Sequence, residues 1–158
     1  MKILIMGLPG SGKSTLAEPL ANELGGIWIN ADAVRKQYDD WDFSTEGRLR
    51  QANRMKQISD GVVMAGKIAI ADFICPTREA RLHFDPDYIV WMDTIKRGKY
   101  DDTNKIFEPP DLSVVNYHVA KWFTDTHAQL AEVVQNFTQR QMENNNNCLL
   151  YTSPSPRD

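Results

Sequence analysis

The sequence has little cysteine, no long apolar run and no excess of positive charge, and each shortage excludes a class of protein. Cys75 and Cys148 are too few for a disulfide scaffold or a cysteine-only zinc site. No apolar stretch approaches the roughly 20 residues that cross a bilayer, so no membrane span is expected. The 18 Lys and Arg against 21 Asp and Glu give a net charge of −3, which argues against general nucleic-acid binding.

What is present is typical of one compact domain. The chain has 158 residues, of which 42% are hydrophobic and 25% charged, enough for a real core. It opens directly into the apolar run Ile3–Met6 without a signal-peptide pattern, which predicts a cytoplasmic protein.

The end of the chain differs in character from the rest. After an asparagine run at residues 144–147, Cys148–Asp158 resembles the translation of a sequencing-library adapter. We therefore expect a single domain over residues 1–147 and a non-native tail over 148–158. Removing the tail deletes one Arg and one Asp, so the net charge stays at −3 and Cys75 becomes the only cysteine.

Apolar runs and helical patterns alternate along the chain. Strands are predicted at Lys2–Met6, Ile27–Ile29, Lys67–Ile74, Tyr88–Met92 and Val114–Val119. Helices are predicted at Lys13–Leu24, from Ser44 to about Ala65, and after Thr124 or Asp125 with Leu130, Val133, Val134 and Phe137 as apolar positions. Pro19 should kink the first helix or loosen its first turns, and Gly47 should weaken the second. The alternation predicts a three-layer α/β domain with a five-stranded, mostly parallel sheet.

The strongest motif is a phosphate-binding loop. Gly7–Ser14 fills the pattern G-x-x-x-x-G-K-[ST] between a predicted strand and a predicted helix. Glycines let backbone N–H groups turn toward an anion, and the helix N-terminus adds partial positive charge. Lys13 is expected to reach the β- and γ-phosphates of ATP, and the Ser14 hydroxyl to ligate Mg²⁺. The predicted ATP-binding residues are Gly7, Leu8, Pro9, Gly10, Ser11, Gly12, Lys13, Ser14 and Thr15.

Other nucleotide-protein classes fit less well. Asn104–Phe107 begins like a guanine-reading N-K-x-D motif but lacks the acid. Ala69–Asp72 is a partial candidate for the magnesium-holding strand of an ATPase motor, but the chain is too short for motor machinery. The size favours a kinase for a small molecule, with its acceptor site at the carboxyl ends of the other strands.

The region after the second predicted strand carries suitable acceptor residues. Asp32 and Arg35 are three residues apart, on one face of a helical turn. Asp32 would accept a proton from the attacking hydroxyl or orient it, and Arg35 would hold an anionic acceptor. Arg48, Arg50 and Arg54 then place three guanidinium groups on one helix, either as an anion site or as a solvated charged face.

Together these motifs resemble the adenylylsulfate kinase family. The family pattern G-L-x-G-S-G-K-S-T is similar to Gly7–Thr15, and D-G-D-N-[VI]-R to Asn30–Arg35. G-F-S-x-x-D-R resembles Asp42–Arg48, I-S-P-Y-R resembles Ile74–Arg78, and D-x-Y-E-P-P resembles the stretch Lys105–Pro110. The resemblance implies a nucleoside-kinase-like P-loop NTPase fold. It also implies use of ATP and Mg²⁺ to phosphorylate the 3′-hydroxyl of adenosine 5′-phosphosulfate (adenylylsulfate), a step of sulfate assimilation.

The resemblance also implies roles for single residues. Asp32, with Lys13, would be catalytic. The implied substrate-binding residues are Asp32 near the 3′-hydroxyl, Arg35 and Arg48 at the phosphosulfate, Phe43 and Ile74 at the adenine, and Gln51 at a position where the family has asparagine. Tyr100 would supply a second stacking ring from a lid shortened to Ile95–Lys105.

Departures from the family pattern leave alternatives open. Asn30 and Ala31 replace its first Asp and Gly, and Gly47 replaces the acid before the arginine. One alternative is a related P-loop kinase for another small hydroxyl compound or for a polynucleotide 5′-end. Another is a nucleotide-binding module without catalysis. The oligomeric state is open, a homodimer included. Trp41 is a further candidate for the pocket wall, and Cys75 is read as a small wall residue.

Overall fold

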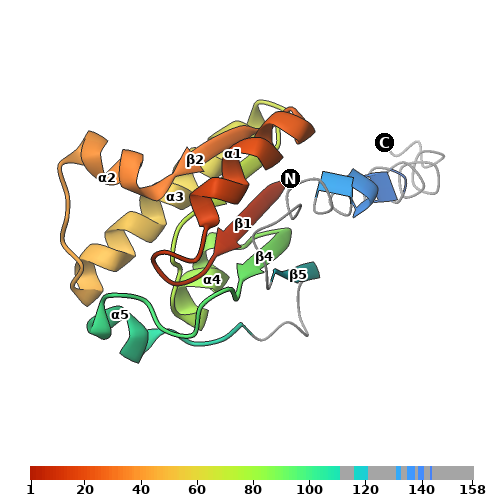
Figure 1. Cartoon of the computed structure of the whole chain (residues 1–158). Coiled ribbons are helices and arrows are strands. Elements are labelled where there is room, and N and C mark those ends of the chain that lie inside the picture. The colour runs from red at the N-terminus through yellow and green to blue at the C-terminus, as the bar shows by residue number, and fades with distance from the viewer. Residues whose placement is uncertain (111–115, 121–130, 133–134, 138, 141–142, 144–158) are drawn as a thin grey trace, which may run out of the picture.

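The computed structural model of the chain describes residues 1–110, 116–120, 131–132, 135–137, 139–140 and 143. Strands and helices alternate along it (Figure 1). In chain order the elements are β1 (Lys2–Met6), α1 (Lys13–Leu24), β2 (Ile27–Asn30), α2 (Ala31–Tyr38), α3 (Thr45–Met64), β3 (Ala69–Asp72), α4 (Arg78–Phe84), β4 (Tyr88–Met92), α5 (Asp101–Ile106) and β5 (Asn116–Ala120).

The strands form one sheet in the order β2-β3-β1-β4-β5, and every neighbouring pair is parallel. β1 lies at the centre, paired with β3 on one side and β4 on the other. Because the strands are parallel, their carboxyl ends lie along the same edge, where an open α/β sheet builds its site. The prediction of a five-stranded α/β fold is confirmed.

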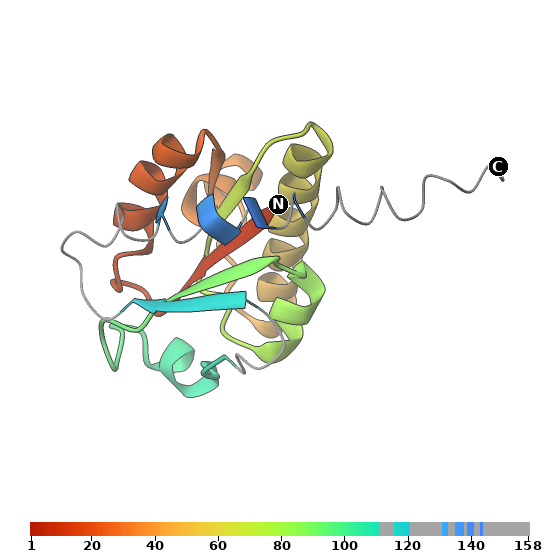
Figure 2. The same ribbon diagram turned by 90° about the vertical axis from the view of Figure 1, so that its right-hand side faces the viewer.

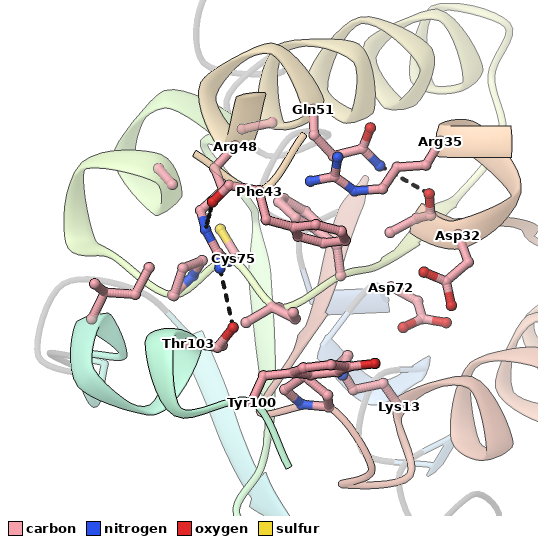
Figure 3. Close-up of a pocket in the computed structure, with 18 of the residues that line it drawn as sticks. Lys13, Asp32, Arg35, Phe43, Arg48, Gln51, Asp72, Cys75, Tyr100 and Thr103 are labelled. Atoms are coloured by element: carbon pink, nitrogen blue, oxygen red, sulfur yellow. Dashed lines mark hydrogen bonds between the residues drawn. The ribbon is translucent and has the colours of Figure 1, made fainter. Parts of the chain in front are cut away.

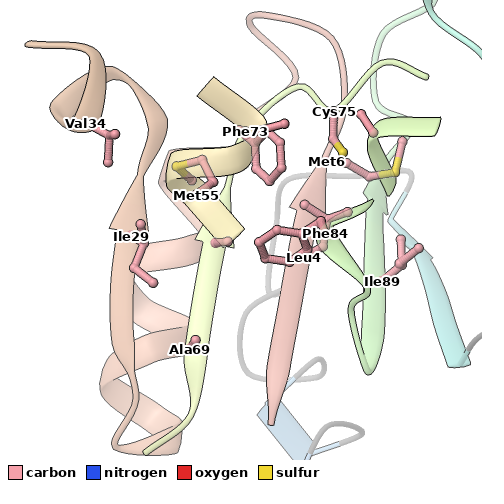
Figure 4. Packing of buried hydrophobic residues seen from close by; sticks show 13 residues of the cluster. Leu4, Met6, Ile29, Val34, Met55, Ala69, Phe73, Cys75, Phe84 and Ile89 are labelled. Carbon is pink, nitrogen blue, oxygen red and sulfur yellow. The ribbon is translucent and has the colours of Figure 1, made fainter. Parts of the chain in front are cut away.

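The alternation of side chains along β1 divides the core into two halves. Ile3 and Ile5 pack with Leu16 and Leu20 of α1 on one face. Leu4 and Met6 face the other way, into a cluster with α3 and α4 (Figure 4). Burying each large aliphatic side chain contributes roughly 1.5–3 kcal/mol. Figure 2 shows α1 and α3 on opposite sides of the sheet, which completes three layers.

The boundaries of β1, α1 and β4 match the predicted ones, whereas others differ. β3 is shorter than predicted and ends at Asp72. α1 continues through Pro19, where a kink was expected. Two short helices, α4 and α5, were not predicted, and α2 was expected only as a helical turn around Asp32 and Arg35, since segments of six to eight residues show little hydrophobic periodicity.

The N-cap predicted for the long helix is confirmed. Ser44 caps α3, and its hydroxyl accepts a hydrogen bond from the Gly47 backbone N–H. A Cβ on Gly47 would lie 2.1 Å from the Asp42 carbonyl oxygen, so the bare backbone lets the preceding loop pack against α3. Gly47, which was expected to weaken the helix, therefore also allows the loop that carries Phe43 to pack against α3.

The last part of the chain is described only in pieces. Ala131 and Phe137 are buried, and the Phe137 ring lies 5.1 Å from that of Tyr88. Thr124, Asp125, Leu130, Val133 and Val134 of the predicted final helix lie outside the described residues, as does the tail 148–158. Among the described residues, no helix combines the length and the apolar character that a membrane span requires.

Candidate active site

The carboxyl ends of β1, β2 and β3 open onto a cavity of about 990 Å³, bounded by the phosphate loop, α2, α3 and α5 (Figure 3). Each predicted substrate-binding residue lines it: Asp32, Arg35, Phe43, Arg48, Gln51, Ile74 and Tyr100. From the phosphate loop, Pro9, Gly10, Gly12, Lys13, Ser14 and Thr15 line the same cavity. Gly7, Leu8 and Ser11 lie behind the loop surface, where they shape its backbone.

The phosphate loop is held by backbone geometry. A Cβ on Gly7 would lie 2.7 Å from the Ser11 hydroxyl oxygen and 2.9 Å from the Met92 carbonyl, so no larger residue fits there. Gly12 caps α1 in the left-handed region, at φ 97°. The loop thus delivers the N-terminus of α1, with its unpaired N–H groups and partial positive charge, to the cavity.

Lys13 supplies the charge of the loop. Its Nζ donates a hydrogen bond to the Leu8 carbonyl, 3.1 Å away, and the side chain is partly buried. Burial lowers the pKa of Lys13, while the carboxylates of Asp72 and Asp32 act in the opposite direction. The two carboxylates therefore favour the charged form of Lys13 at the bottom of the cavity.

Asp72 is the site residue that the sequence analysis did not select. It ends β3, is only 2% exposed, and accepts hydrogen bonds from the Ser14 hydroxyl at 2.8 Å, the Asn30 amide at 3.0 Å and the Trp28 indole at 3.2 Å. The signal in the sequence was an acid at the end of an apolar strand. In the sequence, this acid was interpreted only as part of the magnesium-holding strand of an ATPase motor.

Arg35 fixes the loop between α2 and α3. Its guanidinium is buried and donates through Nη1 to the carbonyls of Asp40 and Asp42, at 3.0 and 3.2 Å. The same group lies over the Phe43 ring, 4.2 Å from its centre. One guanidinium nitrogen thus holds the loop, while the cation stacks on the aromatic ring of the cavity wall.

Arg48 joins Phe43 to the lid. Its Nε donates to the Phe43 carbonyl at 2.8 Å, and its Nη2 lies 3.1 Å from the Thr103 hydroxyl and 3.4 Å from the Asp102 carboxylate of α5. Its guanidinium also lies 5.6 Å from the centre of the Phe43 ring. Phe43 is 44% exposed, so it is a ring presented to the cavity between two cations and not a core residue.

The other predicted residues complete the wall. Asp32 is exposed at the start of α2, where its charge acts on both Lys13 and Arg35. Gln51 is buried and donates to the Ala31 carbonyl, while its Oε1 has no hydrogen-bond partner among the described residues. Tyr100 is half exposed, with the Lys99 ammonium 5.2 Å from its ring centre.

The three arginines of α3 divide into two groups. Arg48 lines the cavity, whereas Arg50 and Arg54 do not. Arg50 pairs with Asp40 and Asp42 at 3.1 and 2.9 Å, and Arg54 pairs with Asp40 at 2.8 Å. The hydrogen bond from Arg50 holds the pKa of Asp40 well below its usual value. Two of the three guanidinium groups therefore belong to a charged surface beside the cavity.

Two smaller expectations concern the wall. Trp41 lines the cavity and is half exposed. Cys75 is buried on the wall, and burial raises the pKa of its thiol to about 12. A thiol that stays protonated at neutral pH is a poor nucleophile, as expected of a wall residue. Among the described residues, no group of three His, Cys, Asp or Glu side chains is placed to hold a metal ion by itself.

A parallel sheet with a phosphate loop after its central strand, and a cavity running from that loop across the strand ends, defines the P-loop kinase class. The sequence model of the adenylylsulphate kinase family matches residues 1–86, more than half of the chain. The protein belongs to this family.

Individual relatives agree with the family assignment. The adenylyl-sulfate kinase of Bacillus velezensis is 31% identical over 116 residues, which cover 70% of this chain and 54% of the relative. The probable adenylyl-sulfate kinase of Bacillus subtilis is 37% identical over 83 residues, 49% of this chain and 42% of the relative. The chain thus spans about half the length of the curated relatives it matches.

Solved structures show the same fold. The APS kinase of Mycobacterium tuberculosis in complex with AMPPNP and APS aligns with a TM-score of 0.65 at 18% identity, over 85% of this chain and 95% of that one. The shikimate kinase of Aquifex aeolicus aligns with a TM-score of 0.60 at 16% identity, over 90% and 98%. One fold thus underlies kinases named for different acceptors.

Proposed function

We propose that the protein transfers the γ-phosphoryl group of ATP to the 3′-hydroxyl of adenosine 5′-phosphosulfate, giving ADP and 3′-phosphoadenylylsulfate. The observation that carries the proposal is the single cavity in which a complete phosphate loop faces Asp32, Arg35, Phe43 and Arg48. Membership of the adenylylsulphate kinase family supports the choice of acceptor.

The donor side binds the phosphates of ATP. The N-terminus of α1 and the loop N–H groups surround them, and Lys13 balances the charge of the transferring group. Since Lys13 is already held beside the loop by its hydrogen bond to the Leu8 carbonyl, it has to reorganise little during transfer.

The acceptor side orients the nucleophile. Asp32 accepts the proton of the 3′-hydroxyl as that oxygen bonds to the γ-phosphorus and the bond to the β-phosphate oxygen breaks. Arg35 uses one nitrogen for its loop contacts, so its remaining N–H donors can bind the phosphosulfate together with Arg48. Phe43 and Tyr100 offer faces for adenine stacking and Ile74 presents its backbone to the base, while the Gln51 Oε1, which has no partner in the described part of the chain, can accept a hydrogen bond.

The site also fits a magnesium ion. Mg²⁺ takes hard oxygen ligands and is usually held through one or two carboxylates together with substrate phosphates and waters. Ser14 offers a hydroxyl within 2.8 Å of a buried carboxylate at the floor of the cavity. When bound, the ion would neutralise charge on the transferring phosphate.

The test is ADP release by the full chain with ATP and Mg²⁺, measured with and without adenosine 5′-phosphosulfate. Stimulation by the acceptor, with one 3′-phosphorylated product for each ADP, is expected. If no acceptor in a panel stimulates release while ATP still binds, the protein is a nucleotide-binding module and the proposal is wrong.

A kinase for another small anionic hydroxyl compound is the second candidate. The hydrogen bonds of Arg48 favour it. The Arg48 Nε and Nη2 groups already donate to Phe43, Thr103 and Asp102, so fewer of its N–H groups remain to bind a phosphosulfate. The same assay decides between them. Faster ADP release with another hydroxyl compound, or with a polynucleotide 5′-hydroxyl end, would replace adenylylsulfate as the acceptor.

A further inference from the structure

Residues 95–100 form neither helix nor strand, yet the backbone of one of them is held by a side chain on both of its polar groups. The Gly98 N–H donates to the Asn104 Oδ1 at 2.8 Å, and the Asn104 Nδ2 donates to the Gly98 carbonyl, also at 2.8 Å. A side-chain amide has both a donor and an acceptor, so it can pair with the N–H and the C=O of a single residue. Asn104, which begins the incomplete guanine-reading motif, thus closes the turn 98–104. This pair of hydrogen bonds is called the Gly98–Asn104 clasp below.

The closed turn lies against the phosphate loop. A Cβ on Gly98 would lie 3.3 Å from the Pro9 carbonyl oxygen, closer than an ordinary contact, so the backbone of the turn packs directly on that loop. Just before the turn, the Thr94 hydroxyl donates to the Ser11 carbonyl. The clasp therefore fixes the shape of a segment whose position beside the nucleotide site is already set.

Tyr100, the ring expected to stack on the acceptor adenine, lies between the two residues of the clasp. It precedes α5 directly but makes no side-chain hydrogen bond that caps this helix, and a helix of six residues is too short to be stable by itself. The Asn104 backbone N–H donates to the Tyr100 carbonyl at 3.1 Å, so the residue that holds Gly98 also closes the first turn of α5. Figure 3 shows Tyr100 reaching into the cavity from this turn.

We propose that Asn104 is a positioning residue for the acceptor: through the clasp it holds Tyr100 in the cavity before the acceptor binds. The proposal rests on the proposed function, in which Tyr100 stacks on the acceptor adenine. Without the clasp the turn has to be ordered during binding, and the apparent affinity falls with the fraction of molecules whose turn is already in place. The phosphate loop is shaped by its own glycines, so nucleotide affinity does not depend on Asn104.

The kinetic test is a double-mutant cycle, measured as steady-state ADP release at varied adenosine 5′-phosphosulfate. Asn104→Ala should raise the KM for this acceptor about 10-fold through the loss of two hydrogen bonds, with the KM for ATP changed less than about twofold. Tyr100→Ala should also raise the acceptor KM. Adding Asn104→Ala to Tyr100→Ala should then change it less than about twofold further, because the clasp acts through this ring. Asn53→Ala, which removes a hydrogen bond to His83 outside the cavity, is the matched control and should behave as wild type.

A second measurement needs no acceptor. Hydrogen exchange of the Gly98 amide, followed by NMR in the free protein, should be about 10-fold faster in Asn104→Ala than in wild type. Asn104→Asp keeps the accepting oxygen and should retain part of this protection. Unchanged Gly98 exchange in Asn104→Ala would overturn the proposal, and so would independent, additive effects of Asn104→Ala and Tyr100→Ala on the acceptor KM. Gly98 protection that Asn104→Ala removes, in a protein whose ADP release adenosine 5′-phosphosulfate does not stimulate, would instead refute the proposed function and leave the clasp in place.

Discussion

The two ends of the cavity are built in different ways. At the phosphate end the backbone makes the site: Gly7 and Gly12 set the loop, Ser11 is fully buried, and Lys13 is partly buried. At the acceptor end side chains make the site, and Asp32 and Phe43 are exposed. The phosphate end tolerates few substitutions, whereas the acceptor end can change residue by residue.

The side chains of the acceptor end are nevertheless held in place by hydrogen bonds. Arg35 and Arg48 donate to backbone carbonyls of residues 40–43, so two cations of the expected anion site also fix the loop that carries Phe43. Changes at this end should therefore alter acceptor use while leaving nucleotide binding intact. The predictions that follow test this separation.

The largest effect is expected at Asp32. Asp32→Asn removes the proton acceptor from the acceptor end and should lower kcat about 10²- to 10⁴-fold with ATP affinity retained. Steady-state ADP release and nucleotide titration measure the two quantities. Asp39→Asn, the same change at the other end of α2, is the control and should keep full turnover. Near-wild-type kcat in Asp32→Asn would remove this residue from the mechanism.

Arg48 should affect acceptor affinity and not ATP affinity. Arg48→Lys keeps the charge but loses the planar fork that reaches Phe43 and Thr103. Hydrogen bonds to charged groups contribute about 1.5–3 kcal/mol, so the KM for the acceptor should rise about 10- to 100-fold. Arg50→Lys, outside the cavity, should change it less than about twofold. Equal effects of both variants would mean that the whole arginine group binds the acceptor.

Two glycines of α3 should respond to alanine with opposite signs. Gly61 has open space around it, so Gly61→Ala should raise the free energy of unfolding by about 0.5–1 kcal/mol through helix propensity. Gly47→Ala places a methyl group against the Asp42 carbonyl and should lower it by about 1–3 kcal/mol. Urea unfolding of both variants measures the difference. A stabilising Gly47→Ala would show that the Phe43 loop does not depend on this contact.

A small, pH-dependent effect is expected at Cys75, where burial raises the pKa of the thiol from 9.0 to about 12. The folded state therefore keeps a proton that the unfolded chain releases above pH 9, so this contribution to stability is complete below pH 9. It is lost as the pH rises toward about 12. At pH 10 the loss should be about 1 kcal/mol relative to pH 8. Urea unfolding at both pH values should show this loss in wild type but not in Cys75→Ala, and equal losses would contradict it.

The contrast between the backbone-built phosphate end and the side-chain-built acceptor end explains how much of the site could be predicted from the sequence. The glycines, Lys13 and Ser14 recur at fixed spacing because backbone geometry demands it, so one contiguous motif located the phosphate end and the strand before it. At the acceptor end, the resemblance to a family selected residues that do line the cavity, but their roles stay predictions. It also left open whether Arg50 and Arg54 belong to the site, because only three-dimensional contacts show that Asp40 and Asp42 bind them.

Asp72 was missed for a related reason. Its importance comes from Ser14, Asn30 and Trp28, three residues far from it in the chain that the parallel register brings to one oxygen. A single acid after an apolar run marks a strand end in the sequence but does not show which residues the fold brings to it. The short helices α4 and α5 were missed, and α2 was expected only as a helical turn, because segments this short show little periodicity. The start of α4 is set instead by a local cap, the Thr77 hydroxyl.

The segment that carries α5 is attached to the body of the protein at both ends. At one end the Thr94 hydroxyl donates to the Ser11 carbonyl of the phosphate loop. At the other the Glu108 backbone is held by the Pro76 carbonyl and by Arg81, which also donates to the Cys75 and Pro76 carbonyls. In mechanical terms the segment is a span with two fixed supports. One support rests on the loop that receives the nucleotide, and between the supports Arg48 ties the span to α3 through the Thr103 hydroxyl.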